Sequence, residues 1–176
     1  MLISRSLLSG VMAALFCLAS PALGGEKYYV KIEGTKQGEF KGNVQRMSSR
    51  WIEIASFSQA AESPRDAATG QASGRRKHEP IVITKQAGAS SPQIWQALHT
   101  NELLKDVLFQ FVRTTAEGKE QVYHTIKLTN ATIASVERIG GNSKNEEERI
   151  KLTYQNIEVM GGQGGVTSKD NWTAPK

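Results

Sequence analysis

The sequence predicts a mainly β protein, folded as a small β-barrel of two sheets with one short α-helix. Three observations predict it. About seven segments alternate apolar and polar residues with the two-residue period of a strand. One stretch alone has apolar residues at convincing helical spacing. Two strand segments change the parity of their apolar positions half-way, after Asn130 and after Tyr154, which is typical of a β-bulge or a corner.

Residues 1–24 have the pattern of a secretory signal peptide. Arg5 supplies a positive start, residues 7–19 form an apolar core, and small residues precede a cleavage point after Gly24. The alternative is a retained membrane anchor, although the apolar stretch is short for one.

The composition of the mature chain, residues 25–176, argues against several classes of site. Cys17 is the only cysteine, so cleavage of the leader leaves no disulfide, thiolate metal site or cysteine nucleophile. Arg5 is the only charge in the leader, so the mature chain keeps 21 cations and 17 anions, a net charge of +4. Nucleic-acid binders usually concentrate much more basicity on one face. An exported chain without disulfides must rely on its core, and this length can bury one.

Three strands are expected in the first half of the mature chain. Residues 27–33 (KYYVKIE) and 50–58 (RWIEIASFS) alternate, and residues 80–86 (PIVITKQ) begin with the proline that a strand tolerates at its first position. A glycine-punctuated loop covers residues 34–44. The segment 59–79 is long, polar and without periodicity, and a loop of this length in a compact domain is usually functional or disordered.

One helix and the remaining strands follow. Ser91 is the expected N-cap, Pro92 lies in the first turn, and the next apolar residues are helically spaced. Glycine at position 118 suits a hairpin turn that needs positive φ. The segments expected as strands are 107–115, 120–128 with its continuation past Asn130, and 149–159.

No catalytic residue, cofactor or metal site is predicted. The three histidines, His78, His99 and His124, do not have the spacing of a zinc site. His99 suits a helix C-terminus, and His124 lies on an apolar strand face, as a core or interface residue would. The chain has no GxSxG motif, and the GGQGG run at 161–165 is not followed by a helix that could bind phosphate.

The densest basic cluster stands directly before the third strand, in GRRKHEPIVITK. A nucleic-acid patch, a loop that docks on a neighbouring subunit and a solvated surface are the alternatives. Aromatic residues are not interleaved with the cations, which disfavours single-stranded nucleic acid. The acidic run at 146–148 is most simply a solvated strand entrance.

Most of the mature chain resembles the haemolysin-coregulated protein (Hcp) family, the tube-forming proteins of bacterial type VI secretion. The similarity is carried by GRRKHEPIVITKQAGASSPQIWQAL and FQFVRTTAEGKEQVYHTIKLTNATIASV, by YYVKIEG and WIEIASFS before them, and by LTYQNIEV after them. These segments occur in the family's order and span roughly residues 27–160.

The resemblance implies an Hcp-like β-barrel over residues 25–160, followed by a glycine-rich tail, 161–176. It implies that copies form a hexameric ring, that rings stack into a hollow tube, and that the lumen can hold effector proteins. The loop 59–79 occupies the place of the family's loop that extends from the barrel and helps rings meet. The residues then expected at a junction between rings or subunits are Arg75, Arg76, Lys77 and His78, with Glu146, Glu147 and Glu148 as their partners.

Typical members of the family have no cleavable leader, so residues 1–24 are a departure. We therefore expect an exported protein, periplasmic or secreted, with no nucleic-acid partner and no membrane contact in its mature form. Its expected function is structural, through self-association. The first alternative is an exported, monomeric ligand-binding barrel whose long loop covers a site. A secreted hydrolase is the other, which the scarcity of converging histidines and acids disfavours.

Overall fold

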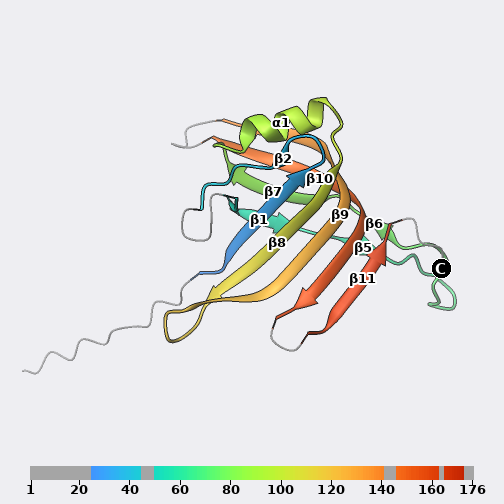
Figure 1. Ribbon diagram of the computed structural model, residues 1–176. Helices are drawn as coiled ribbons and strands as arrows, with labels where there is room; N and C mark the ends of the chain where they lie inside the picture. The colour runs from blue at the N-terminus through green and yellow to red at the C-terminus, as the bar shows by residue number, and fades with distance from the viewer. Residues whose placement is uncertain (1–24, 45–49, 141–145, 163–164, 173–176) are drawn as a thin grey trace, which may run out of the picture.

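The computed structural model describes residues 25–44, 50–140, 146–162 and 165–172 (Figure 1). The predicted signal peptide, residues 1–24, lies outside them. The elements follow in this order: β1 (Lys27–Gly34), β2 (Gly38–Glu39), β3 (Ile52–Ile54), β4 (Ser56–Ser58), β5 (Ala61–Glu62), β6 (Lys77–His78), β7 (Ile81–Gln86), α1 (Ser91–His99), β8 (Leu104–Thr114), β9 (Glu120–Ile139), β10 (Glu147–Gly161) and β11 (Thr167–Asn171). The prediction of a mainly β fold with two sheets and one short helix is confirmed.

The main sheet closes on itself as a barrel. Its strands are ordered β2-β1-β8-β9-β10-β7-β4, and all of the pairings are antiparallel. β3 pairs with β1 at one end of this path, while β4 pairs with β7 at the other. Ala55 alone separates β3 from β4, and its N–H donates to the Thr84 carbonyl at 2.7 Å. The single strand expected over 50–58 is therefore two short strands that turn a corner and join the two ends of the sheet.

The apolar core fills the barrel because alternate residues of each strand point inward. Most of its fully buried members are branched aliphatic or aromatic. They include Val30, Ile32, Ile81, Ile83, Leu104, Val107, Phe109, Leu128, Ile150 and Leu152.

Both predicted parity changes are confirmed as parts of one bend, which we call the crease. Lys105, Asn130 and Gln155 are exposed and stand at the same level on β8, β9 and β10, where both ladders skip a pair. Buried residues change parity there on all three strands. Asn130 has a positive φ of 52°, and its amide donates to Gln155 Oε1 at 2.8 Å. A residue in the left-handed conformation bends a strand, and asparagine adopts this conformation more readily than most other residues.

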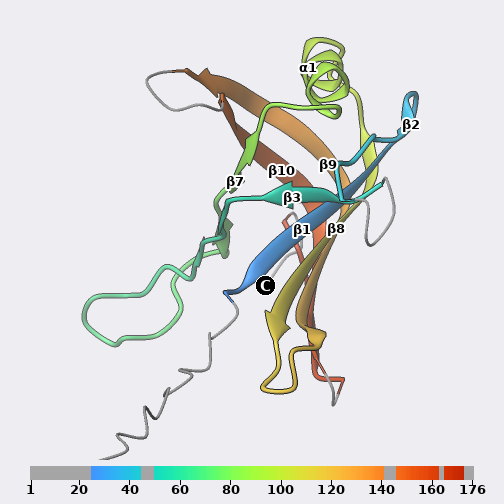
Figure 2. The same ribbon diagram turned by 90° about the vertical axis from the view of Figure 1, so that its left-hand side faces the viewer.

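Helix α1 lies across one end of the barrel (Figures 1 and 2). Ile94 and Ala97 are its buried apolar residues. The N-cap is Ser90 rather than the expected Ser91, and no side-chain capping bond is made. Ser91 is the first helical residue, and its hydroxyl instead contacts charged groups beneath the helix, as described below.

Two segments project from the barrel body. Residues 59–79, here called the loop arm, extend away from it (Figure 2). The arm has no helix, but β5 and β6 pair at its root, and Arg65 bridges to Ala72 near its tip. The glycine-rich segment after β10 turns back and adds β11 to the outer side of β10. Among the described residues, no helix has the length and apolar character needed to cross a membrane.

Candidate self-association surface

The tip of the loop arm is ordered by its own hydrogen bonds. The Asp66 carboxylate accepts from the backbone N–H groups of Ala68 and Thr69 and from the Thr69 hydroxyl, at 2.8–3.0 Å. These bonds, with the Thr69 N–H first among them, lower the pKa of Asp66. Gly70 completes the turn at φ 69°. The arm therefore presents a defined shape although it stands outside the barrel.

The basic cluster in the arm is divided between solvent and the barrel. Arg75 and Lys77 are exposed. His78 alternates with Lys77 on β6 and points inward, where it is 7% exposed. Arg76 reaches the C-terminal strand, and its guanidinium donates to both carboxylate oxygens of Asp170 at 2.7 Å. Arg76 and His78 thus have partners within the same chain.

Asp170 also contacts His78. His78 Nε2 lies 3.1 Å from Asp170 Oδ2, and His78 Nδ1 lies 3.1 Å from the Tyr154 hydroxyl. A carboxylate can only accept, so Nε2 is the protonated nitrogen, and in a neutral imidazole Nδ1 accepts from Tyr154. The Arg76 hydrogen bond, more than any other contact, lowers the pKa of Asp170. Burial, aided by the nearby Asp170 charge, raises the pKa of Tyr154 to about 12.

The acidic run at 146–148 is only partly solvated. Glu146 is exposed and Glu147 is half-buried, whereas Glu148 is fully buried. The simple interpretation of all three as a solvated strand entrance is therefore wrong for Glu148. The signal was present in the sequence, because Glu148 has the same parity as the core residues Ile150 and Leu152.

Glu148 lies at the centre of a charged network beneath α1. Its carboxylate accepts from Lys85 Nζ at 2.9 Å, Ser91 Oγ at 2.6 Å, Trp95 Nε1 at 3.0 Å and Arg138 Nη2 at 3.1 Å. Burial alone would raise the pKa of Glu148, but the hydrogen bonds from Ser91, Lys85 and Trp95 outweigh it and lower the pKa to about 2. Lys85 is itself only 2% exposed. The network attaches the helix to β7, β9 and β10.

Within one chain, Arg76 and His78 bind Asp170, while Glu148 binds Lys85, Ser91, Trp95 and Arg138. The exposed Glu146 side chain lies at the edge of this network, with Oε2 3.9 Å from Arg138 Nε, and the Glu146 carbonyl accepts from the Ala87 N–H at 2.8 Å. Sequence reasoning missed Asp170 and Lys85 because both pairings join strands remote along the chain. The predicted pairing of the basic cluster with the acidic run stays a prediction about contacts between copies.

The other two histidines lie apart from this cluster. His99 is in the last turn of α1 beside Trp95, and His124 packs against Phe111 with ring centres 5.1 Å apart. Across the described ranges, no three His, Cys, Asp or Glu side chains are grouped so that they could hold a metal ion.

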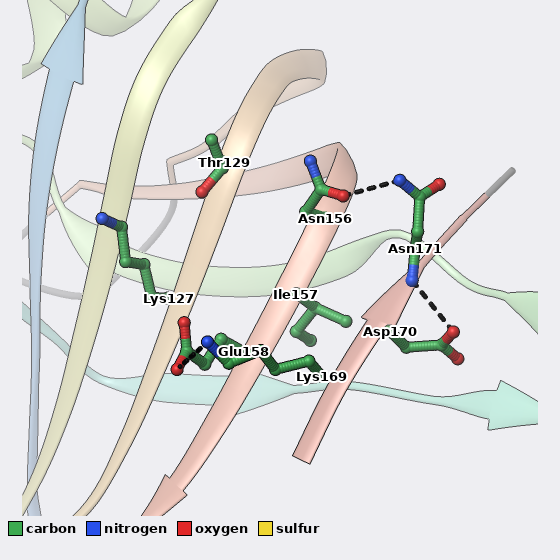
Figure 3. A pocket seen from close by; sticks show the side chains of 8 residues that line it. All are labelled: Lys127, Thr129, Asn156, Ile157, Glu158, Lys169, Asp170 and Asn171. Carbon is green, nitrogen blue, oxygen red and sulfur yellow. Dashed lines mark hydrogen bonds and ion pairs between the residues drawn. The ribbon is translucent and has the colours of Figure 1, made fainter. Parts of the chain in front are cut away.

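The outer face of the wall formed by β9, β10 and β11 is hollowed (Figure 3). This hollow measures about 440 Å³. Lys169 pairs with Glu158 at 3.0 Å, and the Asn171 amide donates to Asn156 at 2.6 Å. Lys127 pairs with Asp106 on β8 at 2.9 Å. The polar side chains that line this hollow thus pair with one another across the strands. Small-molecule sites usually have a largely apolar lining instead.

Comparison with known proteins decides the family. The model of the family described as "Type VI secretion system effector, Hcp" matches residues 29–160, which is most of the chain. The chain belongs to the Hcp family. The "Major exported protein" of Pseudomonas aeruginosa is 30% identical over 175 residues, covering 90% of this chain and 98% of that protein.

Solved Hcp structures share the fold. One described as an Hcp protein has a TM-score of 0.78 at 27% identity and covers 84% of this chain and 100% of its own. Hcp1 from Escherichia coli has a TM-score of 0.76 at 26% identity, covering 83% of this chain and 98% of its own. The secreted Hcp3 of Pseudomonas aeruginosa has a TM-score of 0.71 at 26% identity, covering 85% and 100%. As an Hcp protein, the chain is a structural protein of the type VI secretion tube, a family not known for catalysis.

Proposed function

We propose that the mature chain assembles into hexameric rings that stack into a tube able to hold effector proteins. The observation that carries the proposal is the Hcp barrel together with an ordered loop arm that projects beyond it (Figure 2). The closed barrel leaves few sheet edges for uncontrolled pairing, so identical copies can meet through defined surfaces. The arm reaches outside the protomer with exposed cations, which suits a contact with another copy.

The leader supports export as part of the same proposal. Residues 1–24 would be removed after Gly24, and the mature protein would reach the periplasm or the medium, where no cysteine chemistry is needed. Mass spectrometry of the protein from the host's cell fractions tests this proposal. A mature N-terminus at Gly25 in an exported fraction is expected, and an intact leader in the cytoplasm would contradict it.

Assembly is tested on residues 25–176. Light scattering should give the mass of six chains, and negative-stain images should show rings. Lys77→Glu reverses one exposed charge of the arm and leaves the Arg76–Asp170 pair in place, so hexamers should persist while stacks become fewer. The stronger change, Arg75→Glu with Arg76→Glu, should reduce stacking further. A monomer at all concentrations would refute the assembly.

One observation favours the alternative of a monomeric ligand-binding barrel. A hollow of about 540 Å³ lies beside the root of the loop arm. Its aromatic lining comes from several strands and consists of Tyr28, Phe57, Phe111, Tyr123 and His124. Ser58 and Gln59 add polar groups to the lining, and ligand sites combine aromatic side chains with polar groups that fix orientation. A monomeric mass, together with saturable binding of an aromatic probe that Phe57→Ala abolishes, would support this alternative.

A further inference from the structure

The C-terminal strand and the loop arm are joined at Asp170. We propose that β11 is a clasp that fixes the position of the loop arm and thereby controls contact between stacked rings, with Asp170 as the positioning residue. The effect on stacking rests on the proposed function, in which the arm meets another ring. The effect on the arm itself does not, and it can be measured on a single chain.

The clasp consists of two residues of the arm and its root strand, two of the C-terminal segment and one of β10. They are Arg76, His78, Asp170, Trp172 and Tyr154. The bidentate Arg76–Asp170 pair fixes direction as well as distance, because the guanidinium and the carboxylate are both planar. His78 then bridges Asp170 to the barrel through Tyr154, so that both of its ring nitrogens are bonded.

Aromatic packing completes the clasp. The Trp172 ring lies over His78 with centres 5.5 Å apart and a tilt of 30°, and it meets Tyr154 edge-on at 5.3 Å. The backbone N–H of Trp172 donates to the Gln155 carbonyl at 2.8 Å. This bond extends the pairing of the C-terminal segment with β10 by one residue. His78 is thus enclosed by β10 on one side and by the C-terminal segment on another.

Most of the rest of the arm is exposed. His78 is the buried residue of the segment 59–79, all of which the structure describes, and the others are exposed or half-buried. The β5–β6 ladder comprises only two residue pairs, Ala61 with His78 and Glu62 with Lys77. The Asp66 turn stabilises the tip but binds only neighbouring residues. The direction in which the arm leaves the barrel is therefore set where Arg76 and His78 meet Asp170.

The clasp can open without opening the barrel. Among the described residues, the ladder pairs β11 with β10 alone, and β11 is not part of the ring of strands that β3 and β4 close. The described residues before β11 are exposed, and Val166 is 80% exposed. Loss of the β11 contacts should leave the core and the ring of strands intact.

The test uses residues 25–176 with Asp170→Asn, which keeps the side-chain size but removes the charge. The matched control is Glu158→Gln, which removes a partly exposed ion pair with Lys169 on the same wall. Hydrogen exchange should rise about tenfold in the arm for Asp170→Asn, since a bidentate charge-assisted contact is lost. Exchange in β8 and β9 should not change, and the control should match wild type in both regions.

Assembly is measured on the same samples. Asp170→Asn should keep the hexamer mass and lose stacks, whereas a merely structural defect would reduce hexamers as well. Arg76→Gln should have a similar effect, and the double variant should add nothing to Asp170→Asn, because both substitutions remove the Arg76–Asp170 contact. Unchanged arm exchange overturns the clasp, and loosened arms with normal stacks overturn its control of stacking. If wild type forms no rings, the proposed function fails while the exchange result still decides the clasp.

Discussion

The buried pair of Lys85 and Glu148 allows the attachment of helix α1 to be tested quantitatively. Glu148→Gln keeps the shape of the side chain but leaves the Lys85 ammonium, 2% exposed, without its counter-ion. Breaking a buried ion pair from one side destabilises a protein by about 3–5 kcal/mol. The pKa supports a similar magnitude, because a fall from 4.5 to about 2 corresponds to roughly 3 kcal/mol of stability at neutral pH.

The pH dependence of this loss has a definite sign. The pKa of Glu148 is lower in the folded chain than in the unfolded one, so its carboxylate stabilises the fold fully above about pH 4.5. That contribution disappears as the pH falls toward 2. The difference in free energy of unfolding between wild type and Glu148→Gln should be constant near neutral pH and shrink over this acid range.

Urea denaturation of residues 25–176, followed by circular dichroism at one fixed protein concentration, measures the effect. Glu146→Gln is the control, since its side chain is 61% exposed and the expected change is within about 0.5 kcal/mol. Lys85→Met with Glu148→Leu removes both charges and should recover much of the loss. A loss below about 1 kcal/mol for Glu148→Gln would refute the reasoning.

Three further changes test other parts of the barrel by thermal or urea unfolding. Asn130→Val should destabilise by about 1–2 kcal/mol, because a β-branched residue resists the φ of 52°, whereas Asn130→Gly should be close to neutral. Glu102→Gln should lose about 2 kcal/mol, since the buried carboxylate accepts from the Lys36 and Gln37 N–H groups. Because those bonds lower the pKa of Glu102 against the opposing effect of burial, this difference should fade below about pH 4.5. Gly162→Ala should lose about 1–3 kcal/mol, since a Cβ would stand 2.8 Å from the Tyr123 carbonyl oxygen; equal stability would show that the turn shifts freely.

The periodicity of the sequence predicted most of the barrel, because each strand carries its own pattern. The parity changes after Asn130 and Tyr154 located the bend in β9 and β10 without any knowledge of their neighbours. Closure could not be predicted in the same way. The segment 50–58 alternates as one strand, and only its two different partners, β1 and β7, reveal the corner at Ala55.

The charged residues were harder to interpret than the apolar ones. The composition of a run of three glutamates suggests solvent exposure. The parity of the strand nevertheless places Glu148 inside the barrel, where Lys85 neutralises its charge. The partner of Arg76 could not be found from local pattern, since Asp170 is 94 residues away along the chain. Such pairings depend on which strands become neighbours, and composition alone does not contain that information.

The crease also limits how this chain can change in length. Lys105, Asn130 and Gln155 shift three adjacent strands out of phase together, so losing or gaining one residue in a single strand would reverse the facing of its later side chains relative to both neighbours unless a bulge absorbed the change. Relatives should therefore tolerate length variation most readily at hairpin tips such as 115–119. Within these strands, such a change should be accompanied by a bulge, as at the register shifts between Lys151 and Leu152 and between Phe111 and Val112.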